Sequence, residues 1–145
     1  MKRRRRRVKL MPTHRHTALL VDDYPPARES LQALIEANGF AAVGAHSGGE
    51  ALALLRGGLA CCLIILDWWL PDMAGGDFIR ALRADSALAD IPVTMCTDDT
   101  RMRAEAAALG VTYVLLKPVD PRRLVNLVSH HCSQESPAPA RAASN

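Results

Sequence analysis

Five short apolar segments alternate along the chain with segments whose apolar residues recur at helical spacing. The apolar segments are expected to be strands and the intervening ones helices. Strands are expected at residues 17–21, 41–45, 61–66, 91–96 and 112–116, and helices at 27–38, 49–56, 76–84, 101–109 and 121–131. Strands that alternate with helices of this length pair in parallel through right-handed crossovers. The pattern therefore predicts an α/β fold with a five-stranded, doubly wound parallel sheet.

Local signals support these boundaries. In the first expected helix, Leu31, Leu34 and Ile35 share one face. Gly39 follows this helix and can adopt the left-handed conformation that ends it. Asp120 precedes a proline, which is the arrangement of a helix N-cap followed by the first helical residue. Capping residues therefore mark the end of the first expected helix and the start of the last one.

The chain has the length of one domain, and 49% of its 145 residues are hydrophobic, which is enough for a sizeable core. Residues 1–15 hold eight of the 18 Lys and Arg residues and no acid. The remaining ten cations and 15 acids give the rest of the chain a net charge of −5, although the total is +3. The expected organisation is a basic flexible arm at 1–16, a folded domain at 17–132 and a disordered tail at 133–145.

The basic arm leaves three interpretations open. It is a solvated extension, a segment that contacts nucleic acid or an anionic membrane surface, or a docking segment for an acidic partner. No aromatic residues interleave its arginines, so the solvated extension is favoured and no specific nucleic acid is expected. The most apolar run, residues 59–66, is too short to cross a bilayer. A cytoplasmic protein without a transmembrane segment is therefore expected.

The four cysteines, Cys61, Cys62, Cys96 and Cys132, show no CxxC pair and no metal-ligand spacing. Cys61 and Cys62 are neighbours, and their side chains would point to opposite faces of a strand. All four are interpreted as reduced core residues without a metal or redox role.

Polar residues follow four of the expected strands at their carboxyl ends. Asp22 and Asp23 follow the first strand, Asp67 the third, Thr97 the fourth and Lys117 the fifth. Ligands of open parallel sheets bind at this edge, near the point where the strand order reverses. Three clustered carboxylates repel one another and need a proton or a cation, and Mg²⁺ (or Mn²⁺) prefers such oxygen ligands.

The other two polar groups suit a phosphoryl group. Lys117 offers a mobile positive charge and Thr97 offers a hydroxyl donor. Phosphoryl transfer needs an aligned nucleophile together with groups that neutralise the equatorial oxygens. The set of five residues therefore favours a phosphoryl-transfer site.

Four motifs in order, VDDYPPARESLQALIEANGF, LDWWLPDMAGG, IPVTMCTDD and LLKPVD, resemble the receiver domains of response regulators from about Thr17 to His131. Pro71 and Gly75 also stand where this family places them. The resemblance implies the flavodoxin-like (βα)5 receiver fold with strand order 2-1-3-4-5. It further implies that Asp67 accepts a phosphoryl group from a sensor histidine kinase or a phosphotransfer protein.

The resemblance also assigns the neighbouring roles. The implied metal ligands are Asp22, Asp23, Asp67 and the backbone carbonyl of Trp69. The implied phosphoryl-contacting residues are Thr97 and Lys117. The peptide bond from Lys117 to Pro118 is cis in the family.

Three positions depart from the family pattern. The usual aromatic residue three before the lysine is replaced by Val114, and Tyr113 stands one residue earlier, so its side chain should point to the opposite face. Asp98 and Asp99 add negative charge after Thr97, which should weaken the binding of anionic donors or alter the phosphoryl lifetime. Trp69 could shield an acyl phosphate from water or restrict donor access.

The main hypothesis is a stand-alone, non-enzymatic phosphoacceptor that assists only its own phosphorylation and dephosphorylation. Phosphorylation would switch its binding to a downstream protein, and homodimerisation is left open. One alternative is a receiver-like interaction module that binds its partner without phosphorylation. Another is an aspartyl-nucleophile phosphatase, but that class needs a second aspartate two residues after Asp67, where Trp69 stands.

Overall fold

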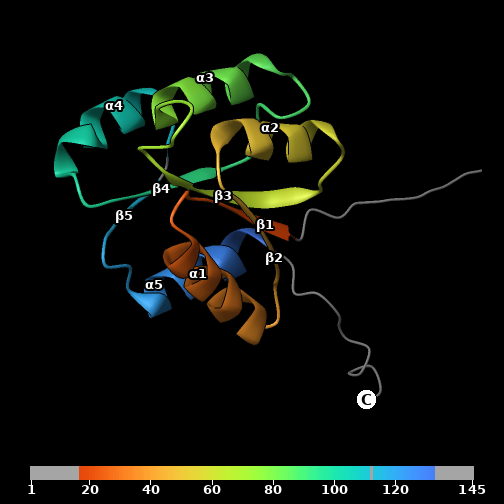
Figure 1. Cartoon of the computed structure of the whole chain (residues 1–145), viewed down its shortest axis with the longest axis vertical. Helices are drawn as coiled ribbons and strands as arrows, with labels where there is room; N and C mark the ends of the chain where they lie inside the picture. The colour runs from red at the N-terminus through yellow and green to blue at the C-terminus, as the bar shows by residue number, and fades with distance from the viewer. Residues whose placement is uncertain (1–16, 112, 133–145) are drawn as a thin grey trace, which may run out of the picture.

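The computed structural model describes residues 17–111 and 113–132, which form a sheet between two layers of helices (Figure 1). The strands are β1 Thr17–Val21, β2 Ala41–Ala45, β3 Cys61–Asp67, β4 Val93–Thr97 and β5 Tyr113–Leu116. The helices are α1 Pro25–Ala37, α2 Gly48–Arg56, α3 Gly75–Ala84, the 3₁₀ turn η3 Thr100–Met102, α4 Arg103–Ala108 and α5 Pro121–His131. All neighbouring strands are parallel, in the order β2-β1-β3-β4-β5. The predicted fold class and strand order are confirmed.

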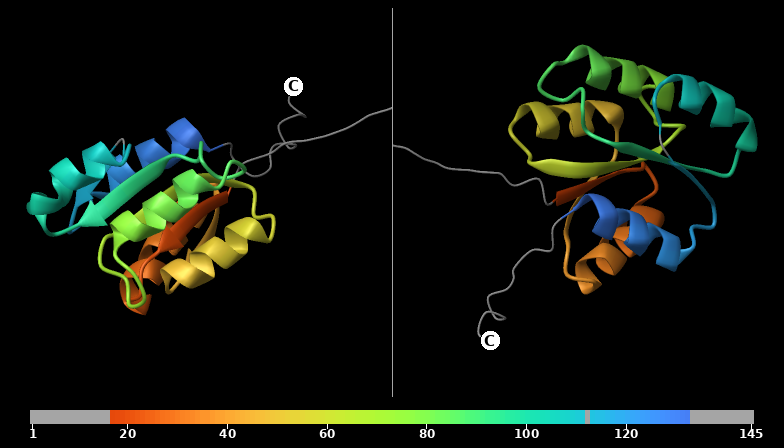
Figure 2. Two further views of the ribbon diagram at one scale, coloured as in Figure 1. Left: turned by 90° about the horizontal axis from the view of Figure 1, so that it is seen from above. Right: turned by 180° about the vertical axis from the view of Figure 1, so that it is seen from behind.

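The two faces of the sheet bury separate cores. Helices α1 and α5 cover one face, and α2, α3 and α4 cover the other (Figures 1 and 2). From Leu63 to Leu66, successive residues of β3 alternate between them: Ile64 packs on the α2–α3–α4 side and Ile65 on the α1–α5 side. Strands β1 and β3 lie inside the sheet and are apolar on both faces, as parallel strands covered by two helical layers must be.

The predicted helix ends agree with the observed caps. Gly39 has φ 89° directly after the end of α1, and the Asp120 side chain accepts a hydrogen bond from the Arg122 backbone N–H at the start of α5. The helix expected at 101–109 begins instead as η3, because the Asp99 carboxylate caps the Arg101 N–H and closes a tighter turn.

Some predictions concern residues that the structure does not describe. The predicted arm at 1–16 and tail at 133–145 lie outside the described residues, as does Thr112. Within residues 17–111 and 113–132, no helix combines the length and apolar character needed to span a bilayer.

The prediction that all four cysteines are reduced is wrong. Cys62 and Cys132 form a disulfide across a sequence separation of 70 residues. Helix α5 runs back against the direction of the strands, so its end returns to the edge of the sheet where β3 begins. Cys61 and Cys62 do point to opposite faces, as expected, and Cys61 and Cys96 are buried thiols outside any disulfide.

Asp72 fastens the loop after β3 to the start of α2. Its two carboxylate oxygens accept hydrogen bonds from the backbone N–H groups of Gly48 and Gly49, at 3.0 and 2.8 Å. These N–H groups belong to the first turn of the helix and have no partner within it. The bonds from Gly49 and Gly48 lower the pKa of Asp72. The loop that follows Asp67 is thereby held against a rigid element.

Asp72→Ala is expected to lower the free energy of unfolding by about 1 kcal/mol at neutral pH, the usual contribution of a capping side chain. Because the folded-state pKa of Asp72 is depressed, its contribution is present above the unfolded-state pKa and is lost as the pH falls through the folded-state pKa. Urea denaturation between neutral and acidic pH measures this difference, with the exposed Asp90→Ala as the control. A difference that stays constant into the acid range would contradict the assignment.

Candidate functional site

Three carboxylates meet at the carboxyl edge of the sheet. Each of the three side chains, Asp22, Asp23 and Asp67, has a carboxylate oxygen that lies within 4.8 Å of one such oxygen on both of the others. Asp22 and Asp23 directly follow β1 and Asp67 ends β3, and these two strands are hydrogen-bonded neighbours. Asp22 is buried, Asp23 is exposed and Asp67 lies between these extremes. The sequence-predicted acidic cluster is therefore assembled by the register of β1 and β3.

Lys117 reaches the cluster from the far side of β4. Its Nζ lies 3.7 Å from Asp22 Oδ2 and 3.6 Å from Asp67 Oδ1. Its backbone N–H donates to the carbonyl of Thr97, which ties the end of β5 to the end of β4. The following Lys117–Pro118 bond is cis. One ammonium group thus faces two of the three carboxylates.

Asp22 is held in place by the segment that follows it. Its Oδ1 accepts a hydrogen bond from the Tyr24 backbone N–H at 2.9 Å. Its backbone carbonyl accepts a hydrogen bond of 2.7 Å from Arg28 Nη1, one turn into α1. Sequence reasoning missed Arg28, although a basic residue in the first turn of a helix after paired acids was an available signal.

The charge balance of the cluster favours a cation. Burial raises the pKa of Asp67, Lys117 opposes this change, and the neighbouring Asp22 and Asp23 add to it. The ammonium of Lys117 lies near two of the three carboxylates, so a further cation would stabilise the cluster by offsetting the remaining repulsion. The donor set consists of hard oxygen ligands, partly open to solvent, and this is the chemistry that suits Mg²⁺.

Thr97 ends β4 at the same edge of the sheet and is buried. Its hydroxyl oxygen accepts a hydrogen bond from the Asp99 backbone N–H at 3.0 Å, which leaves its own O–H free to donate elsewhere. Asp99 itself binds Arg101 through two contacts, at 2.9 and 2.8 Å, and the pKa of Asp99 is lowered by this partner. The extra negative charge expected at Asp99 is therefore paired with Arg101, whereas the Asp98 side chain is exposed.

The two tryptophans after Asp67 have different environments. Trp68 is 2% exposed, and it packs so closely against the start of α3 that a Cβ on Gly75 would lie 3.0 Å from its ring. Trp69 is 56% exposed and, with Tyr24 at 61%, is one of the most exposed large apolar residues in the described part of the chain. Trp68 is therefore a packing residue of the core.

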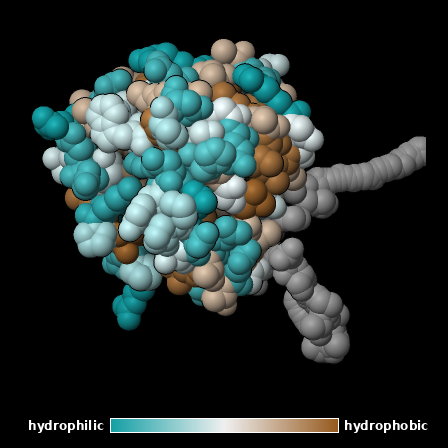
Figure 3. Space-filling view, in the orientation of Figure 1, coloured by the Kyte–Doolittle hydropathy of each residue, from teal (hydrophilic) through white to brown (hydrophobic). Residues whose placement is uncertain are grey.

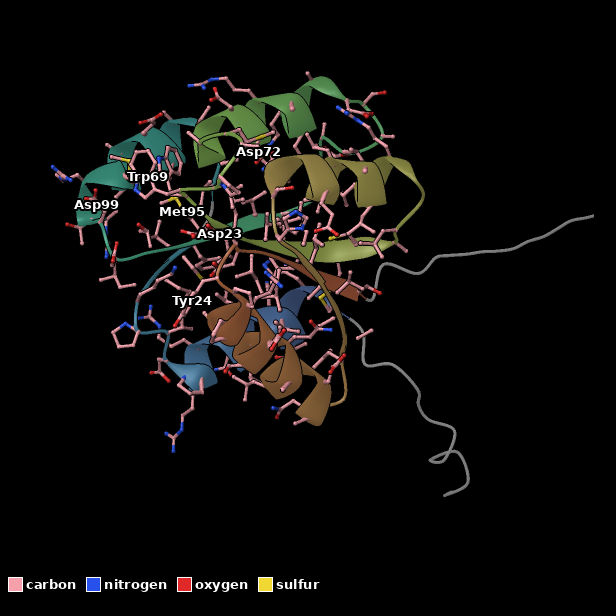
Figure 4. All side chains as sticks on the ribbon, in the orientation of Figure 1. Asp23, Tyr24, Trp69, Asp72, Met95 and Asp99 are labelled. Atoms are coloured by element: carbon pink, nitrogen blue, oxygen red, sulfur yellow. A yellow bond between two sulfur atoms is a disulfide. The ribbon has the colours of Figure 1, made fainter. Side chains whose placement is uncertain are left out.

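The site occupies a hydrophilic part of the surface. Asp23, Trp69 and Asp99, which follow three different strands, lie on the same side of the molecule, with Tyr24 below them (Figure 4). In the same orientation, apolar residues gather on the opposite side (Figure 3). The carboxyl edge therefore presents charge, with exposed aromatic rings nearby.

A family model decides what kind of domain carries this site. The model described as response regulator receiver domain matches residues 18–129. The chain belongs to this family. Receiver domains are modules of two-component signalling, so family membership assigns this functional class to the fold and its acidic cluster.

Individual relatives agree with the family assignment. The receiver domain is 36% identical to the chemotaxis protein CheY of Pseudomonas aeruginosa over 103 residues, which cover 69% of this chain and 82% of that protein. It is 34% identical to the DNA-binding response regulator MtrA of Mycolicibacterium smegmatis over 132 residues, 90% of this chain and 56% of that protein. This chain spans about half the length of MtrA and of the PhoB regulators that it also matches.

Solved structures match over the same region. A response regulator receiver protein from Pseudomonas putida superposes with a TM-score of 0.75 and 33% identity, covering 82% of this chain and 99% of that one. The chemotaxis response regulator CheY4 of Vibrio cholerae gives a TM-score of 0.73 at 30% identity, covering 80% of this chain and 98% of that one. The receiver fold is therefore supported by both sequence and structure.

The displaced aromatic residue of this receiver domain faces away from α4. Val114 packs with the core on the α2–α3–α4 side. Tyr113 instead makes an edge-to-face contact with His131 of α5, with ring centroids 6.4 Å apart. The predicted one-residue offset to the opposite face is confirmed.

Proposed function

We propose that this receiver domain accepts a phosphoryl group on Asp67 and thereby changes the surface that it offers to a downstream protein. The donor would be a phosphohistidine of a sensor histidine kinase or a phosphotransfer protein. The observation that carries the proposal is the convergence of Asp67 with Asp22, Asp23 and Lys117 at one edge of the receiver sheet. The domain would act as a cytoplasmic phosphoacceptor that assists only its own phosphorylation and dephosphorylation.

The transfer is an in-line displacement at phosphorus. A carboxylate oxygen of Asp67 attacks the phosphorus, the P–N bond breaks, and its electron pair returns to the donor imidazole nitrogen. The product is an acyl phosphate. Lys117 lies within 3.6 Å of Asp67 Oδ1 and can neutralise a phosphoryl oxygen as the bond forms. Mg²⁺ held by Asp22, Asp23, Asp67 and the Trp69 carbonyl would supply additional charge neutralisation at the phosphoryl oxygens.

A cleft beside the site offers a route for the donor. Its volume is about 250 Å³, and it lies between α1 and the segment that follows β5. Leu31, Cys96 and Pro118 contribute to its lining, and Asp67 and Lys117 border it. An imidazole ring could approach Asp67 along this cleft. The exposed ring of Trp69 would then contact the donor protein or limit the access of water.

Thr97 provides the connection from the site to the surface. An acyl phosphate on Asp67 would give the Thr97 O–H a strong acceptor. The Asp99 N–H is bonded to the same hydroxyl oxygen, so movement of Thr97 would carry the loop before η3 with it. The output surface would therefore be centred on this loop and on α4. Tyr113 would not take part, because it faces α5.

The alternative of a phosphorylation-independent interaction module is not favoured by the family match. The phosphatase alternative also gains no support, because Trp69 stands where its second aspartate would be required. Both alternatives predict that occupation of Asp67 by a phosphoryl mimic has no regulatory effect.

Tryptophan fluorescence provides the test of this function. Mg²⁺ is expected to change the emission saturably, and beryllofluoride, a phosphoryl mimic, to change it further, because Trp68 and Trp69 directly follow Asp67. Trp68→Phe and Trp69→Phe assign the signal to one ring. The second step should disappear in Asp67→Asn. If beryllofluoride causes no change in emission and no heat in calorimetry while Mg²⁺ binds, the phosphoacceptor role is wrong.

A further inference from the structure

We propose that Cys62 and Cys132 form a reversible thiol–disulfide site that sets the order of the last turn of α5. The proposal concerns the edge of the sheet opposite the acidic cluster. Strand β3 carries Cys62 near its start and Asp67 at its end, which places the two sites about 17 Å apart along the strand. The inference therefore does not depend on phosphorylation of Asp67.

The disulfide continues the buried stripe of α5. Leu124, Val128 and Cys132 are spaced four residues apart, so they share one face of the helix. All three belong to the same buried core as Cys62. The end of α5 lies beside the start of β1 in Figure 1 and in the right-hand view of Figure 2, and the start of β1 is bonded to the residue that precedes β3. Tertiary packing thus holds the two sulfur atoms together even without the covalent bond.

Because Cys132 lies at the end of a helix, this disulfide becomes accessible to exchange when the helix end opens. Cys62 and Cys132 are 4% and 7% exposed in the closed state. Cys132 is the cap residue of α5, and its N–H donates a hydrogen bond to the carbonyl of Val128 in the last turn. The adjoining Ser129 and His130 are exposed. Terminal helical turns open more readily than strand interiors, so fraying of this turn would present the Cys132 sulfur to a reductant.

The other two thiols are poorly placed to compete. Cys61 is in β3 and packs into the core on the opposite face of the sheet from Cys62. Cys96 is buried in β4, and burial raises its pKa to about 12, so at neutral pH it is almost entirely protonated and is a weak nucleophile. Exchange is therefore confined to Cys62 and Cys132.

The reaction needs a dithiol as co-reactant. A thiolate of the dithiol attacks the Cys132 sulfur, the S–S bond breaks, and Cys62 leaves as a thiolate that takes up a proton. The second thiol of the dithiol then attacks the mixed disulfide and releases Cys132 as a thiol. The net change converts the protein disulfide into two thiols and the dithiol into a disulfide. A disulfide oxidant reverses it.

Reduction would loosen one side of the domain without unfolding it. Two protonated thiols still fill the core as small apolar groups, and Leu124 and Val128 still anchor α5. The last turn loses its covalent link to β3. His131 lies in this turn and would be held less firmly, and its ring contacts Tyr113 on the edge strand β5. The redox state would therefore control the order of the α5 end and of the neighbouring edge of β5.

The experiment combines thiol counting with amide hydrogen exchange on the full chain. Protein prepared without reductant, then denatured and alkylated, should be modified at Cys61 and Cys96 only, and all four cysteines should react after treatment with a dithiol. Under native conditions, reduction should increase amide exchange in the last turn of α5 by about tenfold or more while the central strands stay protected. Cys132→Ser should exchange like the reduced protein, and Cys61→Ala should respond to the dithiol like the wild type.

Three results would overturn the proposal. Alkylation of all four cysteines without reductant would mean that the disulfide does not form. Loss of protection throughout the sheet on reduction would make it a static crosslink that the fold requires. Failure of a disulfide oxidant to restore the original exchange pattern would exclude reversibility. The comparison of oxidised and reduced wild type needs no variant, so it remains decisive if Cys132→Ser does not fold.

Discussion

Asp67→Asn is expected to reduce phosphorylation by phosphoramidate or by a phosphohistidine donor to an undetectable level, although the variant folds. The substitution keeps the shape of the side chain and removes the nucleophilic oxygen. It also removes a carboxylate whose pKa is raised by burial and, to a smaller extent, by the neighbouring Asp22 and Asp23. The midpoint of urea denaturation should therefore not fall. Intact mass spectrometry and phosphate-affinity electrophoresis measure the phosphorylation.

The matched control for this variant is Asp90→Asn, which makes the same chemical change at an exposed position outside the acidic cluster. It should be phosphorylated like the wild type. Continued phosphorylation of Asp67→Asn at the wild-type rate would mean that another residue accepts the group.

Lys117→Met is expected to strengthen Mg²⁺ binding and to slow phosphorylation. Lys117 Nζ lies within 3.7 Å of both Asp22 and Asp67, so it competes with a divalent cation for the same carboxylates. Its removal should strengthen Mg²⁺ binding by about tenfold, a modest effect for a neighbouring charge in a partly buried site. The same change removes a charge from the phosphoryl position and should slow phosphorylation by about a hundredfold or more.

Calorimetry with Mg²⁺ and the rate of phosphorylation by phosphoramidate measure the two effects separately. Lys117→Arg is the matched control, because it keeps the charge and alters its shape; Mg²⁺ binding should stay near the wild-type value. Weaker Mg²⁺ binding in Lys117→Met would show that Lys117 does not share its carboxylates with the cation.

The fold and the acidic cluster could be predicted because short-range patterns determine them. Alternating apolar segments specify the parallel sheet, and the sheet then brings the residues after β1 and β3 to one edge. The parallel pattern places Asp22 and Asp67 at the same edge, and the strand order implied by the resemblance to receiver domains makes β1 and β3 neighbours. The orientation of the Tyr113 side chain was equally predictable, because a shift of one residue along a strand reverses the direction in which a side chain points.

The remaining features depend on where distant segments meet. The partner of Cys62 is 70 residues away, and the absence of a local cysteine motif misled the sequence interpretation. The spacing of Leu124, Val128 and Cys132 was the one available signal. The pairing of Asp99 with Arg101 follows from the tight η3 turn, which the helical pattern of residues 101–109 does not distinguish from an ordinary helix start.

The most direct test of the central claim is to locate the phosphoryl group on the chain. Phosphorylated protein is treated with borohydride, which reduces an aspartyl phosphate to homoserine, and the peptides are sequenced by mass spectrometry. The proposed function predicts homoserine at position 67 and unchanged aspartate at positions 22 and 23. Homoserine at either of those positions, or an unmodified Asp67 in protein whose mass shows a phosphoryl group, would contradict it.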